Sequence, residues 1–180
     1  KQISHLLRYM GISINTVPVL DIPRPFTSKV IGTRAISKDI NVINKIGEKT
    51  IEHFKEARIA TVIKHIPGHG LAKSDSHLKL PIVDKTYEYL MKNDFKTFKN
   101  KKSLFAMTAH ILFKKIDANN PVTHSSKIID IIKKKIKFKN LIISDDISMK
   151  ALKFNITLNT IKAFTAGCDL VLHCNGKIKE

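Results

Sequence analysis

Apolar residues follow two alternating patterns along the chain, short continuous runs and longer segments with three-and-four spacing. Continuous runs bounded by turn residues are typical of buried strands, whereas three-and-four spacing is typical of helices with one buried face. The runs predict five strands: Ile12–Leu20, Thr61–His65, Leu104–His110, Leu141–Asp146 and Asp169–Cys174. The spaced segments predict helices: one ending near Gly11, then Ile40–Phe54, Tyr87–Phe98, Ser125–Ile136 and a shorter one through Leu152 and Ala163.

Strands that alternate with helices indicate parallel βα units, because parallel neighbours need crossover connections that cover the sheet. The predicted fold class is therefore α/β, as either an open doubly wound sheet or a (β/α)8 TIM-type barrel. No glycine-rich phosphate-binding turn follows the first strand, and every predicted strand has a polar residue at its carboxyl end: Asp21, His65, His110, Asp145 and His173. Because those ends meet at one mouth in a barrel, we expect a barrel of which about five βα units are present.

The sequence predicts a single domain, residues 1–180, that is incomplete at both ends. The chain begins with Lys1 rather than Met, and helical spacing is already present from Ile3 to Met10. A complete barrel of this type has eight units, so about three would lie outside this sequence.

Neither a membrane span nor a signal peptide is evident. No run approaches the roughly 18 apolar residues that a spanning helix needs, and the opening KQISHLLRYMG lacks an apolar core and a cleavage site. We therefore expect a cytoplasmic protein without a membrane partner. Cys168 and Cys174 have neither redox nor zinc spacing, and we interpret them as plain thiols.

The formal charge of +17 is the most unusual bulk property. Such an excess is compatible with a nucleic-acid partner, but the lysines are spread over predicted helices instead of gathering with aromatic residues. Examples are Lys45, Lys49, Lys92, Lys96 and Lys133–Lys135. We favour solvated helix faces over nucleic-acid binding, and the same charge could steer an anionic substrate.

The segment KHIPGHGLAKSDSHLKLP, residues 64–81, concentrates titratable side chains in an exposed loop shaped by glycine and proline. Asp75 and His77 are separated by one residue, so the carboxylate can bond one imidazole nitrogen and leave the other free for proton transfer near neutral pH. An acid/base dyad and a capping Asp beside a surface His are about equally consistent with this spacing.

Asp145 and Asp146 follow the apolar run LIIS and therefore belong at a strand end. Alternation along the strand would direct one carboxylate into the barrel mouth and the other aside. One is then a candidate nucleophile, and its neighbour would cap a helix starting at Ile147, although two capping residues would fit equally well.

A metal-dependent hydrolase is the alternative enzyme class. His65, His69, His110 and Asp145 could together hold a divalent ion that activates water. A Pro-Gly turn separates His65 from His69, however, so no helix face sets a chelating geometry in advance.

Taken together, these motifs resemble the glycoside hydrolase family 3 β-N-acetylhexosaminidases, bacterial cytosolic enzymes of cell-wall recycling. KHIPGHG, followed by DSH and LP, is similar to the family signature, in which the first segment usually reads KHFPGHG. Further similarities occur in order along the chain: GISINTVPVLD, IGTRA, MTAH, SDDISMKAL and AGCDLVL. The resemblance thus covers nearly the whole chain.

The resemblance implies specific roles for the matching residues. Asp145 would be the nucleophile that forms a covalent glycosyl-enzyme, and His77 the acid/base, with Asp75 as its dyad partner. Lys64, His65 and Arg34 would bind the sugar, and Met149 would line the pocket. The implied reaction is retaining hydrolysis of terminal β-linked N-acetylglucosamine from muropeptides, by a monomer without metal or other cofactor and without a nucleic-acid partner. The family's upstream Asp-Gln-Glu-Gly-Gly-Arg segment has no counterpart here.

Overall fold

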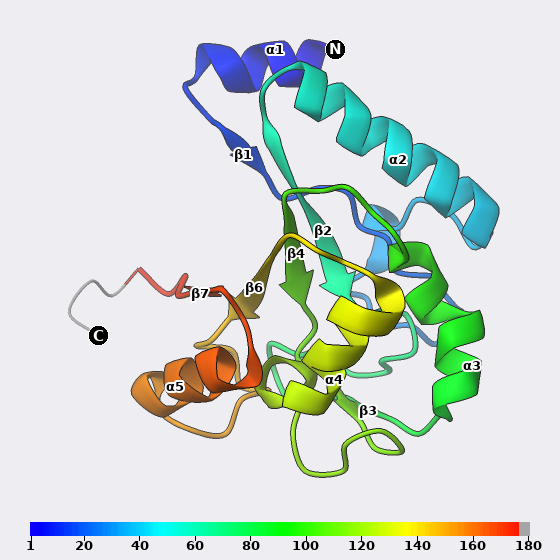
Figure 1. Cartoon of the computed structure of the whole chain (residues 1–180), viewed down its shortest axis with the longest axis vertical. Coiled ribbons are helices and arrows are strands. Elements are labelled where there is room, and N and C mark those ends of the chain that lie inside the picture. The colour runs from blue at the N-terminus through cyan, green and yellow to red at the C-terminus, as the bar shows by residue number, and fades with distance from the viewer. Residues whose placement is uncertain (177–180) are drawn as a thin grey trace.

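A computed structural model describes residues 1–176 of the chain. Five parallel strands form one sheet in the order β1 (Ile14–Asn15), β2 (Ala60–Ile66), β4 (Phe105–Thr108), β6 (Leu141–Asp146) and β7 (Leu170–Leu172). Strand order in the sheet is therefore the order along the chain (Figure 1). A doubly wound sheet reverses its order at a switch point, whereas a barrel adds each strand on the same side. The expected TIM-type fold with five units is confirmed.

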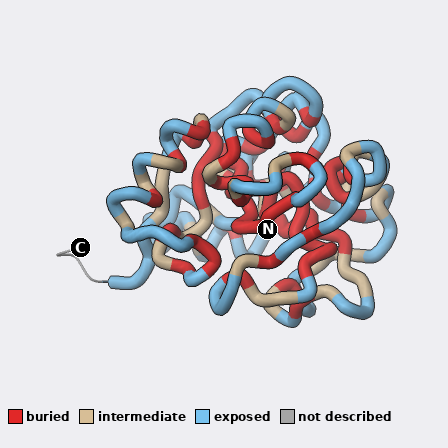
Figure 2. Tube along the Cα trace, turned by 90° about the horizontal axis from the view of Figure 1, so that it is seen from below, coloured by how far each residue is buried: buried red, intermediate tan, exposed pale blue. Residues whose placement is uncertain are grey.

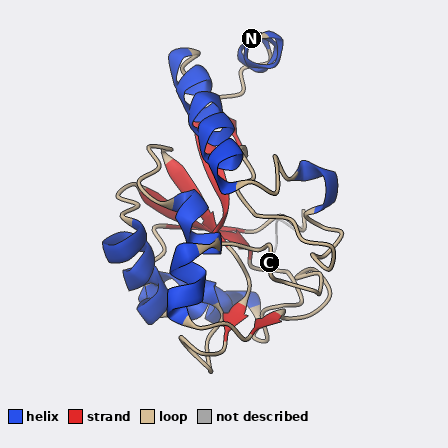
Figure 3. Ribbon diagram, turned by 90° about the vertical axis from the view of Figure 1, so that its right-hand side faces the viewer, coloured by secondary structure: helices blue, strands red, loops and turns tan. Residues whose placement is uncertain are grey.

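One helix, α1 (Gln2–Tyr9), precedes β1, and the other helices connect the successive strands of the sheet. They are α2 (Ile40–Glu56), α3 (Tyr87–Lys92), α4 (Ser126–Ile131) and α5 (Ile156–Ala166). Shorter 3₁₀ turns lie at Gly32–Arg34 (η1), Asp94–Phe98 (η2) and Val122–His124 (η3), and a π-turn at Ile132–Ile136 (η4) extends α4. The helices gather on one side of the sheet and the long loops on the other (Figure 3).

Four of these helices have a polar N-cap residue, whose side chain accepts a hydrogen bond from the first turn of the helix. Asp39 accepts hydrogen bonds from the first free N–H groups of α2, at 2.6 Å from Asn41 and 3.3 Å from Val42. Equivalent caps are Thr86 for α3, Ser125 for α4 and Asn155 for α5. Each cap satisfies an N–H that has no partner within its helix, and so sets where the helix starts.

Two predicted elements differ from the structure, and one observed sheet was not predicted. The predicted strand Ile12–Leu20 pairs only at β1 and through a bridge from Val19 to Lys64, because Pro18 interrupts the ladder and has no N–H to donate. The predicted helix Tyr87–Phe98 is broken at Asn93 into α3 and η2. A second sheet, β3 (Ile82–Val83) beside β5 (Leu112–Phe113), was not predicted.

The central strands of the sheet, β2, β4 and β6, are buried on both faces, as expected of parallel strands, whereas β1 and β7 are partly exposed. Ile63, Ala106 and Ile142 face the helices and join the main core with Ile43 and Ile51 of α2. The alternate residues form a separate cluster on the opposite face: Val62, Phe105, Met107 and Ile143. Figure 2 shows the buried residues concentrated in the interior of the chain.

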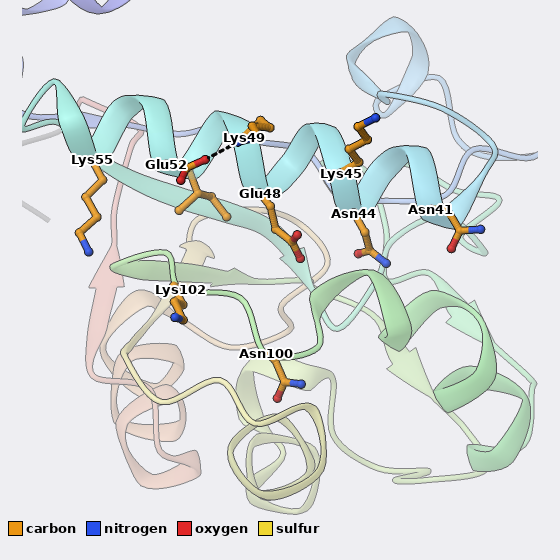
Figure 4. Close-up of a pocket in the computed structure, with 10 residues that line it drawn as sticks. Asn41, Asn44, Lys45, Glu48, Lys49, Glu52, Lys55, Asn100 and Lys102 are labelled. Atoms are coloured by element: carbon orange, nitrogen blue, oxygen red, sulfur yellow. Dashed lines mark hydrogen bonds and ion pairs between the residues drawn. The ribbon is translucent and has the colours of Figure 1, made fainter.

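Lysines lie on solvated helix faces, as the sequence predicts. All seven examples named above are exposed. On α2, Lys49 contacts Glu52 at 2.8 Å, whereas Glu48 points toward the segment that contains Asn100 and Lys102 (Figure 4). Cys168 and Cys174 are free thiols, and none of the helices described is long and apolar enough to cross a membrane.

The loop after β1 is tied to η2 by an ion pair and to the loop after β2 by a hydrogen bond and a close backbone approach. Arg24 makes a two-pronged contact with Asp94, 2.8 Å from Nη1 to Oδ1 and 2.7 Å from Nη2 to Oδ2. Thr27 donates from its hydroxyl to the carbonyl of Gly70 at 2.6 Å. A Cβ atom at Gly70 would lie 2.0 Å from the carbonyl oxygen of Ile22, so only glycine fits there.

Gly70→Ala is therefore expected to lower the free energy of unfolding by about 1–3 kcal/mol or more, because backbone must move to admit the methyl group. Gly47→Ala is the matched control. A Cβ there meets the mobile end of the Leu20 side chain at 2.6 Å, and the change gains helix propensity in α2. Urea unfolding of both variants of the intact natural protein measures the difference; equal stabilities would contradict the close approach.

Candidate active site

The carboxyl ends of the parallel strands surround a pocket of about 220 Å³. Five of the predicted site residues line it, Arg34 from η1, Lys64 and His65 from β2, His77 from the following loop and Asp145 from β6. The remaining lining residues are Thr16, Val30, His69, Ser76, Met107, Leu172 and Cys174. Residues that are far apart in the sequence thus meet where the strand order places them.

Two predicted residues do not line this pocket. Asp75 lies behind His77 and contacts it. Met149 is 6 % exposed and is not among the lining residues, whereas Met107 of β4 is. The role of Met149 stays a prediction.

The Asp75–His77 contact has the geometry of a dyad. Asp75 Oδ1 lies 2.7 Å from His77 Nδ1 and also accepts the backbone N–H of His77 at 2.8 Å. Burial would raise the pKa of Asp75, but the hydrogen bonds from His77 hold it below its ordinary value. A carboxylate at Nδ1 favours the tautomer with its proton there, which leaves Nε2 free for proton transfer. One carboxylate oxygen therefore makes the contact that each interpretation requires, and the acid/base role of His77 stays a prediction.

Asp145 and Asp146 diverge as alternation predicts. Asp145 lines the pocket, and its Oδ1 accepts the backbone N–H of Asp146 at 2.9 Å. Asp146 turns aside and accepts from the Ser148 N–H at 3.0 Å, the Ser148 hydroxyl at 2.7 Å and the Cys174 N–H at 3.1 Å. These bonds hold the pKa of Asp146 below its ordinary value although burial opposes them.

The predicted helix cap at Ile147 was wrong. Residues 147–152 form turns, and the next helix, α5, begins at Ile156 with Asn155 as its cap. Asp146 instead accepts the backbone N–H of Ser148 in this turn and that of Cys174 after β7. A carboxylate thus binds free backbone N–H groups here as it would at a helix N-terminus.

Asp21 organises the histidines beside the pocket. Its buried carboxylate accepts from His65 Nδ1 at 2.7 Å, from the His65 N–H at 3.2 Å and from the His69 N–H at 2.6 Å. Burial would raise the pKa of Asp21, but His65 and His69 hold it below its ordinary value. Because Nδ1 of His65 is bound to Asp21, Nε2 is the ring nitrogen that remains available to a ligand.

His110 is buried next to this region and uses both of its ring nitrogens in hydrogen bonds. Its Nε2 donates to the carbonyl of Asp146 at 3.0 Å, so Nδ1 must accept the hydroxyl of Thr123 at 2.7 Å. Burial lowers the pKa of His110, which is consistent with a neutral ring. Because both of its nitrogens are engaged, His110 has none left for a metal.

The alternative metal site gains no support from the geometry. One ring nitrogen of His65 is bonded to Asp21, and both ring nitrogens of His110 are bonded, to Thr123 and to the Asp146 carbonyl. Within residues 1–176, no group of three or more His, Cys, Asp or Glu side chains is placed to hold a metal ion.

Positive charge faces Asp145 across the pocket. Burial lowers the pKa of Lys64 and neighbouring Arg34 lowers it further, whereas Asp145 and Asp21 raise it. Arg34 is fixed by a bond from Nε to the carbonyl of Val30 at 2.9 Å. The pocket therefore offers a carboxylate, two cationic donors and a free imidazole edge to a polar ligand.

Sequence reasoning missed two contributors. Asp21 was noted only as a polar residue at a strand end, and its position directly after an apolar run was the available signal. Ser76 was not singled out, although it lies between Asp75 and His77 and lines the pocket.

Comparisons with known proteins agree with this geometry. The model of the glycosyl hydrolase family 3 N-terminal domain matches residues 1–180. Among curated relatives, the β-hexosaminidase of Methylobacillus flagellatus is 33% identical over 175 residues, covering 94% of this chain and 50% of that protein. The β-hexosaminidase of Glaesserella parasuis is 35% identical over 172 residues, with 92% and 50% covered. The chain spans about half the length of the curated relatives that it matches.

Solved structures give the same result. A family 3 β-N-acetylglucosaminidase from Paenibacillus sp. superposes with a TM-score of 0.90 at 29% identity, over 95% of this chain and 34% of that one. NagZ from Neisseria gonorrhoeae superposes with a TM-score of 0.85 at 29% identity, over 96% and 50% of the two chains.

The bonds of Asp21 predict a pH-dependent stability. Because its folded pKa lies below the ordinary value of 3.8, the stabilisation is fully present above about pH 4 and is lost as pH falls through the folded pKa. Asp21→Asn should cost about 1–3 kcal/mol at neutral pH, and less in acid. Urea unfolding at both pH values measures this. Asp130→Asn, at an exposed site on α4, is the control and should differ little; an Asp21→Asn deficit that persists unchanged in acid would refute the argument.

Proposed function

We propose that this chain, which belongs to glycosyl hydrolase family 3, carries the catalytic centre of a retaining β-N-acetylglucosaminidase. The observation that supports this most strongly is the presence of Asp145 and the dyad member His77 on one pocket at the strand carboxyl ends. The curated relatives are named as β-hexosaminidases, and two of the solved structures as β-N-acetylglucosaminidases.

The proposed reaction has two steps. His77, protonated on Nε2, donates that proton to the leaving oxygen while Asp145 attacks the anomeric carbon and forms a glycosyl-enzyme ester. The neutral imidazole then removes a proton from water, which displaces Asp145 and releases the sugar with its original configuration. Asp75 orients the ring and stabilises the imidazolium that recurs at the end of the cycle.

Sugar binding is assigned to the polar residues around Asp145. Lys64, Arg34 and the free nitrogen of His65 would contact sugar hydroxyls, and Met149 would line the pocket. These residues act on a terminal, non-reducing N-acetylglucosamine in the proposal. Arg34 and His65 are held by bonds to Val30 and Asp21, so little ordering of these two side chains is needed when sugar binds.

The finer substrate proposal is a muropeptide derived from peptidoglycan, handled by a cytoplasmic, monomeric enzyme. The family resemblance supports it, and so does the net charge of +17, since muropeptides carry carboxylates that a positive field attracts.

Asp145→Ala is expected to abolish turnover of an aryl β-N-acetylglucosaminide by the intact natural protein, because no other group can form the ester. His77→Ala should lower both steps by about 10²–10⁴-fold. Asp130→Ala, a matched change on the surface of α4, should leave the rate unchanged. Release of the phenol measures all three, and an unchanged rate in Asp145→Ala would refute the assignment.

Removal of metal ions distinguishes the two enzyme classes. Because none of the proposed steps uses a metal, activity should persist after dialysis against excess chelator. A rate that disappears on chelation and returns only with added zinc would instead favour the metal-dependent hydrolase.

A further inference from the structure

Ser76 is buried between two exposed neighbours. The side chains of Asp75 and His77 are 32 % and 59 % exposed, whereas Ser76 is 3 % exposed. A small polar residue gains little by burial unless its polar atoms find partners. Ser76 is therefore a point at which the segment with Asp75 and His77 is attached to the rest of the chain.

The backbone of Ser76 reaches the segment that follows Asp145. Its carbonyl accepts the N–H of Ala151 at 3.1 Å. That segment is itself fixed at Asp146, whose carbonyl accepts from His110 and whose side chain holds Ser148. One backbone bond thus links the loop with the dyad to the segment with the predicted nucleophile.

The side chain of Ser76 reaches a second fixed group. Its hydroxyl lies 3.4 Å from His69 Nε2, and the N–H of His69 is bound to Asp21 at 2.6 Å. Burial, together with the charge of His65, lowers the pKa of His69 to about 4, so the ring is neutral at pH 7.

The tautomer of His69 follows from its other nitrogen. Nδ1 is buried and has no hydrogen-bond partner among the described residues. An N–H without a partner costs more than an unused acceptor, so the proton belongs on Nε2, which donates to Ser76. Ser76 is thereby connected through His69 to Asp21, the carboxylate that also fixes His65.

We propose that Ser76 is a positioning residue: it holds the Asp75–His77 dyad at a set place over Asp145 by attaching the loop to His69 and to Ala151. This inference rests on the proposed function. The side-chain hydrogen bonds given for Asp75 and His77 join these two residues to each other, so Ser76 between them supplies their bonds to His69 and Ala151. Loss of the Ser76 hydroxyl misplaces the proton donor and leaves Asp145 in place.

The dependence of rate on the leaving group tests this directly. A 2,4-dinitrophenol departs without protonation, whereas an unsubstituted phenol needs the acid. Ser76→Ala in the intact natural protein should lower kcat/KM for the phenyl β-N-acetylglucosaminide about tenfold, which corresponds to a barrier raised by roughly 1.4 kcal/mol through loss of one hydrogen bond. It should change kcat/KM little for the dinitrophenyl substrate.

Ser103→Ala is the matched control. Ser103 is fully buried at the opposite end of the sheet, where its hydroxyl donates to the carbonyl of Thr61 at 2.6 Å. This variant should lose stability and affect both substrates equally. A Ser76→Ala protein that loses activity equally on both substrates, or on neither, overturns the positioning role. A natural protein that cleaves neither substrate overturns the proposed function itself and this inference with it.

Discussion

Asp21 places a carboxylate, 1 % exposed, where the chain after β1, the end of β2 and the Pro-Gly turn beyond it converge. A buried charge is costly unless donors surround it, and three donors from His65 and His69 do so. The satisfied network rigidifies its members, because any displacement leaves the carboxylate unpaired in a medium of low dielectric constant. The orientation of the His65 ring and the position of the His69 backbone, to whose side chain Ser76 is attached, both depend on this group.

The order of the parallel strands brings Asp145 to the same end of the sheet as the residues that Asp21 fixes. Because each βα unit adds a strand on the same side, residues that end β2 and β6 come to one edge although about eighty residues separate Lys64 from Asp145. The apolar runs and the polar residues that end them made this much predictable: alternation along LIISDD places one Asp in the pocket and the other aside, as observed.

Other features depend on contacts that no local pattern contains. The second sheet joins strands of two residues each, too short to produce a period, and Pro18 leaves only a fragment of the strand expected at residues 12–20. The turn after Asp146 resembles a helix start because the same carboxylate chemistry caps both. The choice between cap and dyad for Asp75 could not be made from spacing, since one oxygen serves the backbone and the imidazole of His77 together. The hydrogen bonds of Asp21 join the segment after β1, the end of β2 and the turn beyond it, so they form only when these three segments have come together.

The central claim is that Asp145 attacks the sugar. A fluorinated N-acetylglucosaminyl fluoride, which forms a glycosyl-enzyme faster than water can break it down, tests this most directly in the intact natural protein. Digestion and mass spectrometry should locate one N-acetylhexosaminyl derivative on the peptide LIISDD, at the side chain of Asp145. A derivative on Asp146 or on a different segment, or hydrolysis with inversion and without any derivative, would contradict the account.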